Sequence, residues 1–158
     1  MIKDGCLEGI QEVYGLHNTD LFSEGLVGLK SGPLMSSIAD IFIRVKGKGA
    51  HSSVPHMAKD VISAGAAIIQ NLHLIQSRHV ASHENFALTI TKFHGGDCNN
   101  VFPDEATLEG TIRCFSNEVY QSAIAKIREV VETSASMLSC TADVEFNAYR
   151  PAVVNHPK

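Results

Sequence analysis

The sequence predicts an α+β domain in which two helices cover one face of a four-stranded, largely antiparallel sheet. Four segments between residues 38 and 148 alternate apolar and polar residues, the pattern of a strand with one buried face. Two longer segments repeat apolar residues every three or four positions, as amphipathic helices do. The order of these segments, β-α-β-β-α-β, is that of the ferredoxin-like two-layer sandwich.

Each element has its own local pattern. The first strand, IADIFIRVK, alternates apolar residues with Asp40, Arg44 and Lys46. Ser116 is placed to cap the second helix, and Glu118 lies in its first turn, where the helix dipole favours a negative charge. The predicted strands cover 38–46, 86–94, 105–115 and 142–148, and the predicted helices cover 59–77 and 117–139. The apolar stripe of the second helix is predicted to contain Tyr120, Ile124, Ile127, Val130, Val131, Ser134 and Leu138.

The segment before this pattern is different in character. Residues 1–37 are rich in glycine and serine, and they predict a short strand at 12–16, a loop and a linker. The regular pattern ends at Arg150-Pro151. A four-stranded sheet of this kind leaves an open edge, and such an edge needs protection or a partner.

Composition excludes several classes of function. The 158 residues suffice for one domain with a core, and a net charge of −4 argues against a broad nucleic-acid surface. An RNA-binding sheet of the same topology is also disfavoured, because the open strand faces lack paired aromatic residues. No apolar run approaches the roughly 20 residues that cross a bilayer. The first ten residues, MIKDGCLEGI, do not resemble a secretory signal.

The cysteines indicate the compartment. Cys6, Cys98, Cys114 and Cys140 form neither a C-x-x-C pair nor a zinc-finger spacing. Four reduced thiols in a cytoplasmic protein are expected, with two disulfides in a secreted domain as the alternative.

Eight histidines invite the hypothesis of a metal site, but their spacing does not support one formed by this chain alone. His51 and His56 lie five residues apart in a loop, and no H-E-x-x-H helix occurs. His73, His79 and His83 gather around the end of the first helix, where the dipole favours a positive charge.

Three other features could bind a substrate. His51 follows the glycines of GKGAH, where an imidazole can donate to an oxyanion; an ordinary loop histidine is the alternative. Asn99 and Asn100 could orient a carbonyl group, although asparagine in such loops usually forms turns. Arg113, near the end of a strand, could hold a carboxylate in a bidentate pair or form a surface ion pair.

The segments GPLMSSIADIFIRVKGKGAHSSVPHMAKDVISAGAAIIQNL and GGDCNNVFPDEATLEGTIRCFS resemble the lid domain of the aminoacylase and carboxypeptidase family of dinuclear zinc peptidases. The branch of hippurate hydrolase and the indoleacetyl-amino acid amidohydrolases is most similar. In that family two lids pair through an edge strand and a helix to form a homodimer. The resemblance therefore implies a hydrolase of N-acyl amino acids or related peptides, with two divalent metal ions, zinc above all.

The resemblance also assigns residues. It implies that His51 reaches a neighbouring active site and stabilises the oxyanion, that Asn100, with Asn99 beside it, binds substrate, and that Arg113 holds the free carboxylate. VYGLHN resembles a catalytic-domain strand whose histidine, here His17, binds one metal ion.

The rest of the family's catalytic machinery is missing from this sequence. The first metal-binding segment, the Glu-Glu pair and the final histidine ligand are absent. Residues 1–29 and 149–158 are therefore expected to be catalytic-domain segments that flank a lid over 30–148. This chain alone is expected to bind no metal and to be inactive. The alternative is a stand-alone dimerising or small-ligand-binding module without catalysis.

Overall fold

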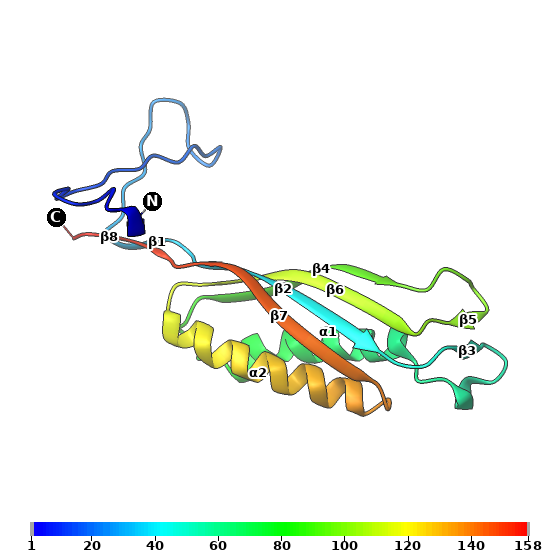
Figure 1. Cartoon of the computed structure of the whole chain (residues 1–158). Helices are drawn as coiled ribbons and strands as arrows, with labels where there is room; N and C mark the ends of the chain where they lie inside the picture. The colour runs from blue at the N-terminus through cyan, green and yellow to red at the C-terminus, as the bar shows by residue number, and fades with distance from the viewer. Residues whose placement is uncertain (1, 158) are drawn as a thin grey trace.

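The computed structural model describes residues 2–157 and has the predicted two-layer architecture (Figure 1). Its helices and strands follow the chain in the order η1 (Ile2–Asp4), β1 (Gly32–Met35), β2 (Ile38–Lys46), β3 (Ala50–His51), η2 (Pro55–Met57), α1 (Val61–Arg78), β4 (Phe86–Gly95), β5 (Val101–Phe102), β6 (Glu105–Cys114), α2 (Asn117–Ser136), β7 (Thr141–Arg150) and β8 (Val153–Asn155). All four predicted strands and both predicted helices are present.

The main sheet is antiparallel throughout and has the strand order β4-β6-β2-β7. Strand β2 lies inside the sheet, where Ile43 is opposite Leu108 on β6 and Val144 on β7. Strands β4 and β7 are therefore the two edges. This order and the β-α-β-β-α-β sequence of elements confirm the ferredoxin-like prediction.

Both helices pack on one face of the sheet, and the core lies between the two layers (Figure 1). Helix α1 packs against the β4 side and α2 against the β7 side. The side chains of Ile43 on β2, Ile68 on α1 and Ile127 on α2 are completely buried. The opposite sheet face carries the polar residues of the alternation, so only one sheet face contributes to this core.

The ends of the helices differ slightly from the prediction, for local reasons. Helix α1 begins at Val61 because Asp60 caps it: one carboxylate oxygen accepts from the Ile62 and Ser63 backbone N–H groups, at 2.9 and 3.1 Å. Helix α2 ends at Ser136, three residues early, and Ser139 has a left-handed φ of 58°. Leu138 therefore lies beyond the helix and is 36% exposed, outside the stripe that the sequence predicted.

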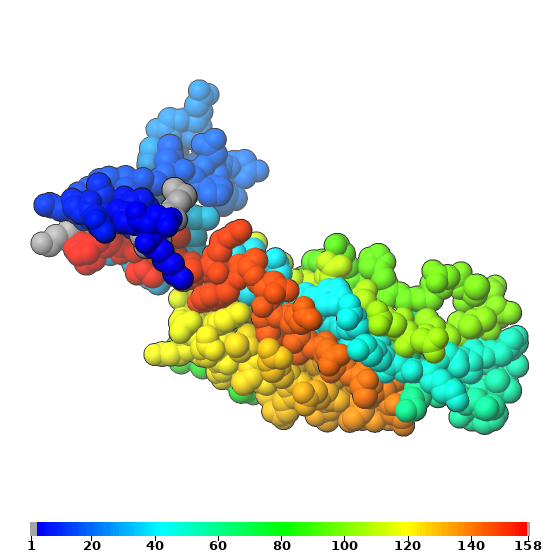
Figure 2. All heavy atoms as spheres, viewed as in Figure 1, coloured from blue at the N-terminus to red at the C-terminus, as the bar shows by residue number. Residues whose placement is uncertain are grey.

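A second, smaller ribbon connects the sandwich to the two ends of the chain. Strands β1 and β8 pair antiparallel, with Pro33 opposite Val154. The strand predicted at 12–16 is wrong: these residues have no regular structure, and the apolar side chains of Val13, Tyr14 and Leu16 are exposed. Without a neighbouring strand or a core, the short apolar run has nothing to pair with. Figure 2 shows this segment, in blue, lying with the C-terminal segment at one end of an elongated molecule.

No helix in the described part of the chain is long and apolar enough to span a membrane.

Candidate functional site

A two-residue ladder at the far end of the sandwich brings His51 and Asn100 together. Strand β3 pairs antiparallel with β5, which places His51 opposite Val101. One residue further, the Ser52 backbone N–H donates to the Asn100 carbonyl oxygen at 2.9 Å. In Figure 1 this ribbon projects beyond the sheet at the end opposite the chain termini. Two of the predicted site residues, far apart in sequence, are therefore neighbours.

Asp104 holds the glycine-rich loop that carries His51. Its carboxylate accepts from the Gly49 backbone N–H at 2.7 Å, and its carbonyl oxygen accepts from Gly47 at 2.8 Å. A Cβ atom on Gly49 would lie 2.7 Å from the Phe102 carbonyl oxygen, so a larger residue does not fit there. Asp104 is not among the site residues predicted from the sequence. The sequence feature that could have indicated Asp104 is its position in NVFPDE, shortly after Asn99 and Asn100.

Ser53 fixes the orientation of the His51 imidazole. The Ser53 backbone N–H donates to Nδ1 of His51 at 3.1 Å, and the Ser53 hydroxyl lies 2.8 Å from the same nitrogen. A backbone N–H can only donate, so Nδ1 is the acceptor and the proton of the neutral ring is on Nε2. The imidazole is exposed, and its Nε2–H can donate to a group outside this chain.

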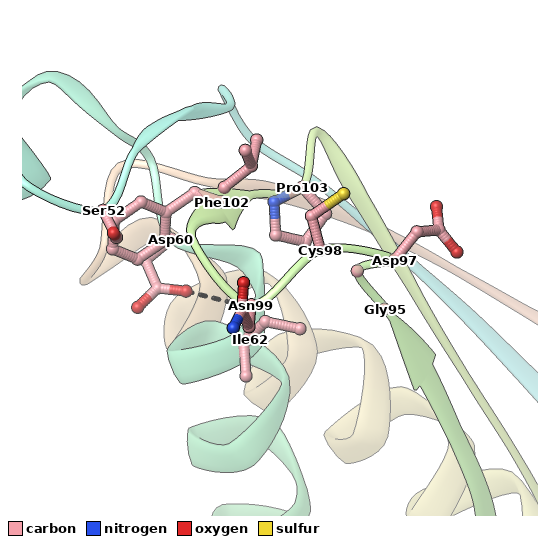
Figure 3. Close-up of a pocket in the computed structure, with 11 residues that line it drawn as sticks. Ser52, Asp60, Ile62, Gly95, Asp97, Cys98, Asn99, Phe102 and Pro103 are labelled. Carbon is pink, nitrogen blue, oxygen red and sulfur yellow. Dashed lines mark hydrogen bonds between the residues drawn. The ribbon is translucent and has the colours of Figure 1, made fainter.

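Asn99 lines a shallow hollow of about 530 Å³ beside the ladder. Figure 3 shows this hollow between the loop that carries Asp97, Cys98 and Asn99 and the first turn of α1, which is capped by Asp60. Ser52 and Phe102 contribute from the ladder itself. Asn100 does not line the hollow, so the two asparagines, adjacent in sequence, have different surroundings.

Arg113 lies at the other end of the sheet from His51. It is the penultimate residue of β6, opposite Ala87, on the face away from the helices. The eight residue-to-residue steps from Glu105 to Arg113 correspond to roughly 27 Å of extended strand. The structure therefore does not bring Arg113 together with His51 and Asn100. Within residues 2–157, the exposed Arg113 guanidinium forms neither an ion pair nor a hydrogen bond with another side chain.

His17, the predicted metal ligand, lies in the irregular N-terminal segment. Its Nδ1 donates to the Asn18 carbonyl oxygen at 2.6 Å, and its side chain is exposed. Among the described residues, no group of three or more His, Cys, Asp or Glu side chains could hold a metal ion. Two metal ions need several such ligands, and the residues between 2 and 157 do not bring them together.

The fold and this distribution of residues define a small α+β domain that presents polar groups at both ends of its main sheet. Residues 35–136 match the peptidase dimerisation domain of the M20 family. The chain therefore belongs to the dimerisation domains of the M20 metal-dependent hydrolases.

Curated relatives match over nearly the whole chain. N-acetylcysteine deacetylase of Bacillus subtilis is 36% identical over 155 residues, which are 98% of this chain and 41% of the relative. The IAA-amino acid hydrolase ILR1-like 4 of Arabidopsis thaliana is 32% identical over 146 residues, 92% of this chain and 33% of the relative. The chain thus spans about two fifths or less of the length of these relatives.

Solved structures share the fold. An aminohydrolase from methicillin-resistant Staphylococcus aureus superposes with a TM-score of 0.90 at 31% identity, over 99% of this chain and 42% of that one. A dinuclear metal-binding M20 peptidase from Bacillus subtilis gives a TM-score of 0.77 at 31% identity, over 99% of this chain and 38% of that one.

Proposed function

We propose that this chain is the lid and dimerisation domain of an amidohydrolase that cleaves the amide bond of N-acyl amino acids or related peptides. The observation that carries this proposal is the pair of exposed polar groups at the two ends of the sheet, the Nε2–H of His51 and the Arg113 guanidinium, in a chain of this family. The names of the relatives, an N-acetylcysteine deacetylase and an IAA-amino acid hydrolase, support the substrate class.

Arg113 binds the free carboxylate of the substrate. Its guanidinium has no side-chain partner among the described residues, and a planar guanidinium forms two parallel hydrogen bonds with a carboxylate. The end of β6 that carries Arg113 lies beside the link between β1 and β2, because the Ser37 N–H donates to the Cys114 carbonyl oxygen. From this end of the sheet β1 and β8 lead to the chain termini (Figure 1). Arg113 therefore acts at the catalytic domain of its own subunit.

His51 assists at the active site of the partner subunit. Because Nδ1 accepts from Ser53, the Nε2–H is directed to an external acceptor, and the developing oxyanion of the amide is such an acceptor. Asn100 and Asn99, on the same loops, orient the substrate. The distance between the two ends of the sheet makes a second copy necessary, since one copy cannot place His51 and Arg113 on one small substrate.

The second copy docks on edge strand β4 and the adjoining side of α1. Helix α1 has no charged residue before Arg78, whereas α2 contains five. Ile62 is 37% exposed and Phe93, on β4, is 36% exposed. These two residues, together with Ala66, Ile69 and His73 at helical spacing, form an uncharged surface beside the open edge of β4. We call this the α1–β4 surface. A homodimer joined here would extend the sheet and cover that edge.

The segment before β1 belongs to the catalytic domain. Its large apolar side chains are mostly exposed: Leu16 is 85% and Leu29 is 90% exposed. Exposed apolar side chains in such number usually mark a surface that contacts another protein segment. We therefore assign residues 1–29 and 149–158 to the catalytic domain and 30–148 to the lid. His17 supplies one of the ligands for two divalent metal ions, zinc above all, and the remaining ligands come from outside this chain.

All four cysteines are unpaired in the structure, which supports a reducing compartment such as the cytoplasm.

The proposal is tested by assaying hydrolysis of N-acetyl amino acids with added zinc, for this chain and for the complete protein that contains it. We expect turnover only by the complete protein. Turnover by this chain alone would contradict the assignment, and an inactive complete protein would favour a stand-alone binding module.

A further inference from the structure

The sandwich contains two buried polar side chains within residues 2–157, Ser37 and Ser134, each 3% exposed. Ser134 has an ordinary structural role, because its hydroxyl accepts from Asn71 and joins the two helices. Ser37 lies elsewhere, in the short link between β1 and β2, and its hydroxyl and its backbone N–H both bond to Cys114, the residue directly after Arg113.

The contacts of Ser37 hold both backbone groups of Cys114. The Ser37 hydroxyl donates to the Cys114 carbonyl oxygen at 2.8 Å and accepts from the Cys114 N–H at 3.3 Å. The Ser37 backbone N–H donates to the same carbonyl oxygen at 2.7 Å. The Cys114 thiol also lies 3.2 Å from the hydroxyl. One side chain thus uses its donor and its acceptor capacity on a single residue.

These contacts occur where the regular ladder stops. The last paired residues of β2 and β6 are Ala39 and Ile112, so Arg113 has no ladder partner on β2. On its other side it is opposite Ala87 of β4. The Cys114 N–H belongs to the peptide group that follows the Arg113 Cα atom. Holding this group fixes the backbone of Arg113 and the direction in which its side chain leaves the sheet.

We propose that Ser37 is a positioning residue for Arg113, and that it sets the geometry with which the guanidinium binds the substrate carboxylate. The inference rests on the proposed function of Arg113. Ser37 does not touch the substrate; it acts through the Cys114 backbone. Because Ser37 also begins the link from the sheet to the β1–β8 ribbon, it ties the carboxylate-binding end of the lid to the segment that leads to the catalytic domain.

The test uses Ser37→Ala, Ser37→Thr, Arg113→Ala and the double variant Ser37→Ala/Arg113→Ala in the complete enzyme. Ser134→Ala is the control, because it also removes a buried serine hydroxyl. The readout is kcat and KM for an N-acetyl amino acid and for its carboxamide, which lacks the carboxylate. Ser37→Ala is expected to raise KM for the acid by about tenfold, with kcat and the carboxamide little changed, since a small displacement of a binding group weakens its contact. Ser37→Thr, which keeps the hydroxyl, should restore most of the affinity.

The outcomes separate this inference from the function on which it rests. If Arg113→Ala leaves KM for the acid unchanged, the proposed role of Arg113 is wrong, and the role of Ser37 falls with it. If Arg113→Ala raises KM for the acid but Ser37→Ala does not, only the positioning role is overturned. The same holds if Ser37→Ala raises KM by the same factor in the Arg113→Ala background as in the wild type. An equal KM effect of Ser134→Ala would overturn it as well, because general destabilisation would then suffice. In the 158-residue chain, Ser37→Ala should also speed amide exchange at Cys114, and unchanged exchange would contradict the contacts described above.

Discussion

His51 and Arg113 stand at opposite ends of one antiparallel sheet, with the length of strand β6 between them. Both are exposed, and both project groups suited to a polar substrate. A substrate the size of an N-acyl amino acid spans a small part of that distance. The two residues can therefore serve the same reaction only if two copies of the chain contribute to each active site.

Dimerisation through the α1–β4 surface predicts a clear difference between two alanine positions. Ala66, on α1, and Ala125, on α2, are both exposed, so a new side chain fits at either position. Ala66→Glu would place a charge in an uncharged interface and is expected to weaken the dimer by tenfold or more, since an unpaired buried charge is costly. Ala125→Glu should leave association unchanged. Sedimentation velocity over a concentration series measures both.

Should Ala125→Glu dissociate the dimer while Ala66→Glu does not, the second copy docks on the α2 and β7 side instead. Equal unfolding midpoints for the two variants would confirm that association, and not folding, has been compared.

The close approach of β4 and β6 at Gly110 predicts a loss of stability on substitution. A Cβ atom there would collide with the Thr89 carbonyl oxygen and lie 2.9 Å from the Ile90 Cα atom, both in the backbone. Gly110→Ala should therefore reduce the free energy of unfolding by about 1–3 kcal/mol or more, as overpacking does. At Gly15 nothing lies within 4 Å of the added atom, so Gly15→Ala is the control. Urea unfolding measures both, and equal midpoints would contradict the register of these strands.

The cysteines should react with a thiol reagent in two groups. Cys6 and Cys98 are exposed, whereas Cys114 and Cys140 are buried. Burial also raises the pKa of the Cys140 thiol, so less of the reactive thiolate is present at neutral pH. Two thiols should be labelled rapidly in the native chain and four in denaturant. Rapid labelling of all four in the native chain would contradict the placement of Cys114 and Cys140 in the core.

Most of the fold could be predicted because periodicity reports which face of an element is buried. Strand β2 shows this best: its alternating residues, from Ala39 to Val45, are buried as the pattern requires. Features that depend on partners distant in sequence were not predictable. The apolar run at 12–16 predicts a strand, but nothing beside it provides a second one. The β1–β8 ribbon is similar, because Pro33 pairs with Val154, which is 121 positions away in the sequence.

Less of the candidate site than of the fold could be predicted from the sequence. The ladder that joins His51 to Val101 has two residues per strand, too few for any periodicity. The sequence marks His51, Asn100 and Arg113 as separate polar positions, and only a structure shows that two of them are neighbours and the third is remote. Ser37 carries no sequence signal at all, since a serine between two strands usually belongs to a turn.

The central claim is that each active site combines His51 of one subunit with Arg113 of the other, and subunit mixing tests it most directly. At a substrate concentration far below the raised KM of Arg113→Ala, the variants His51→Ala and Arg113→Ala of the complete enzyme are each expected to show little activity as homodimers. When equal amounts are unfolded and refolded together, random pairing places one complete site in each mixed dimer, and about one quarter of the wild-type activity should return. Mixed dimers that form, as native mass spectrometry would show, but regain no activity would contradict the claim.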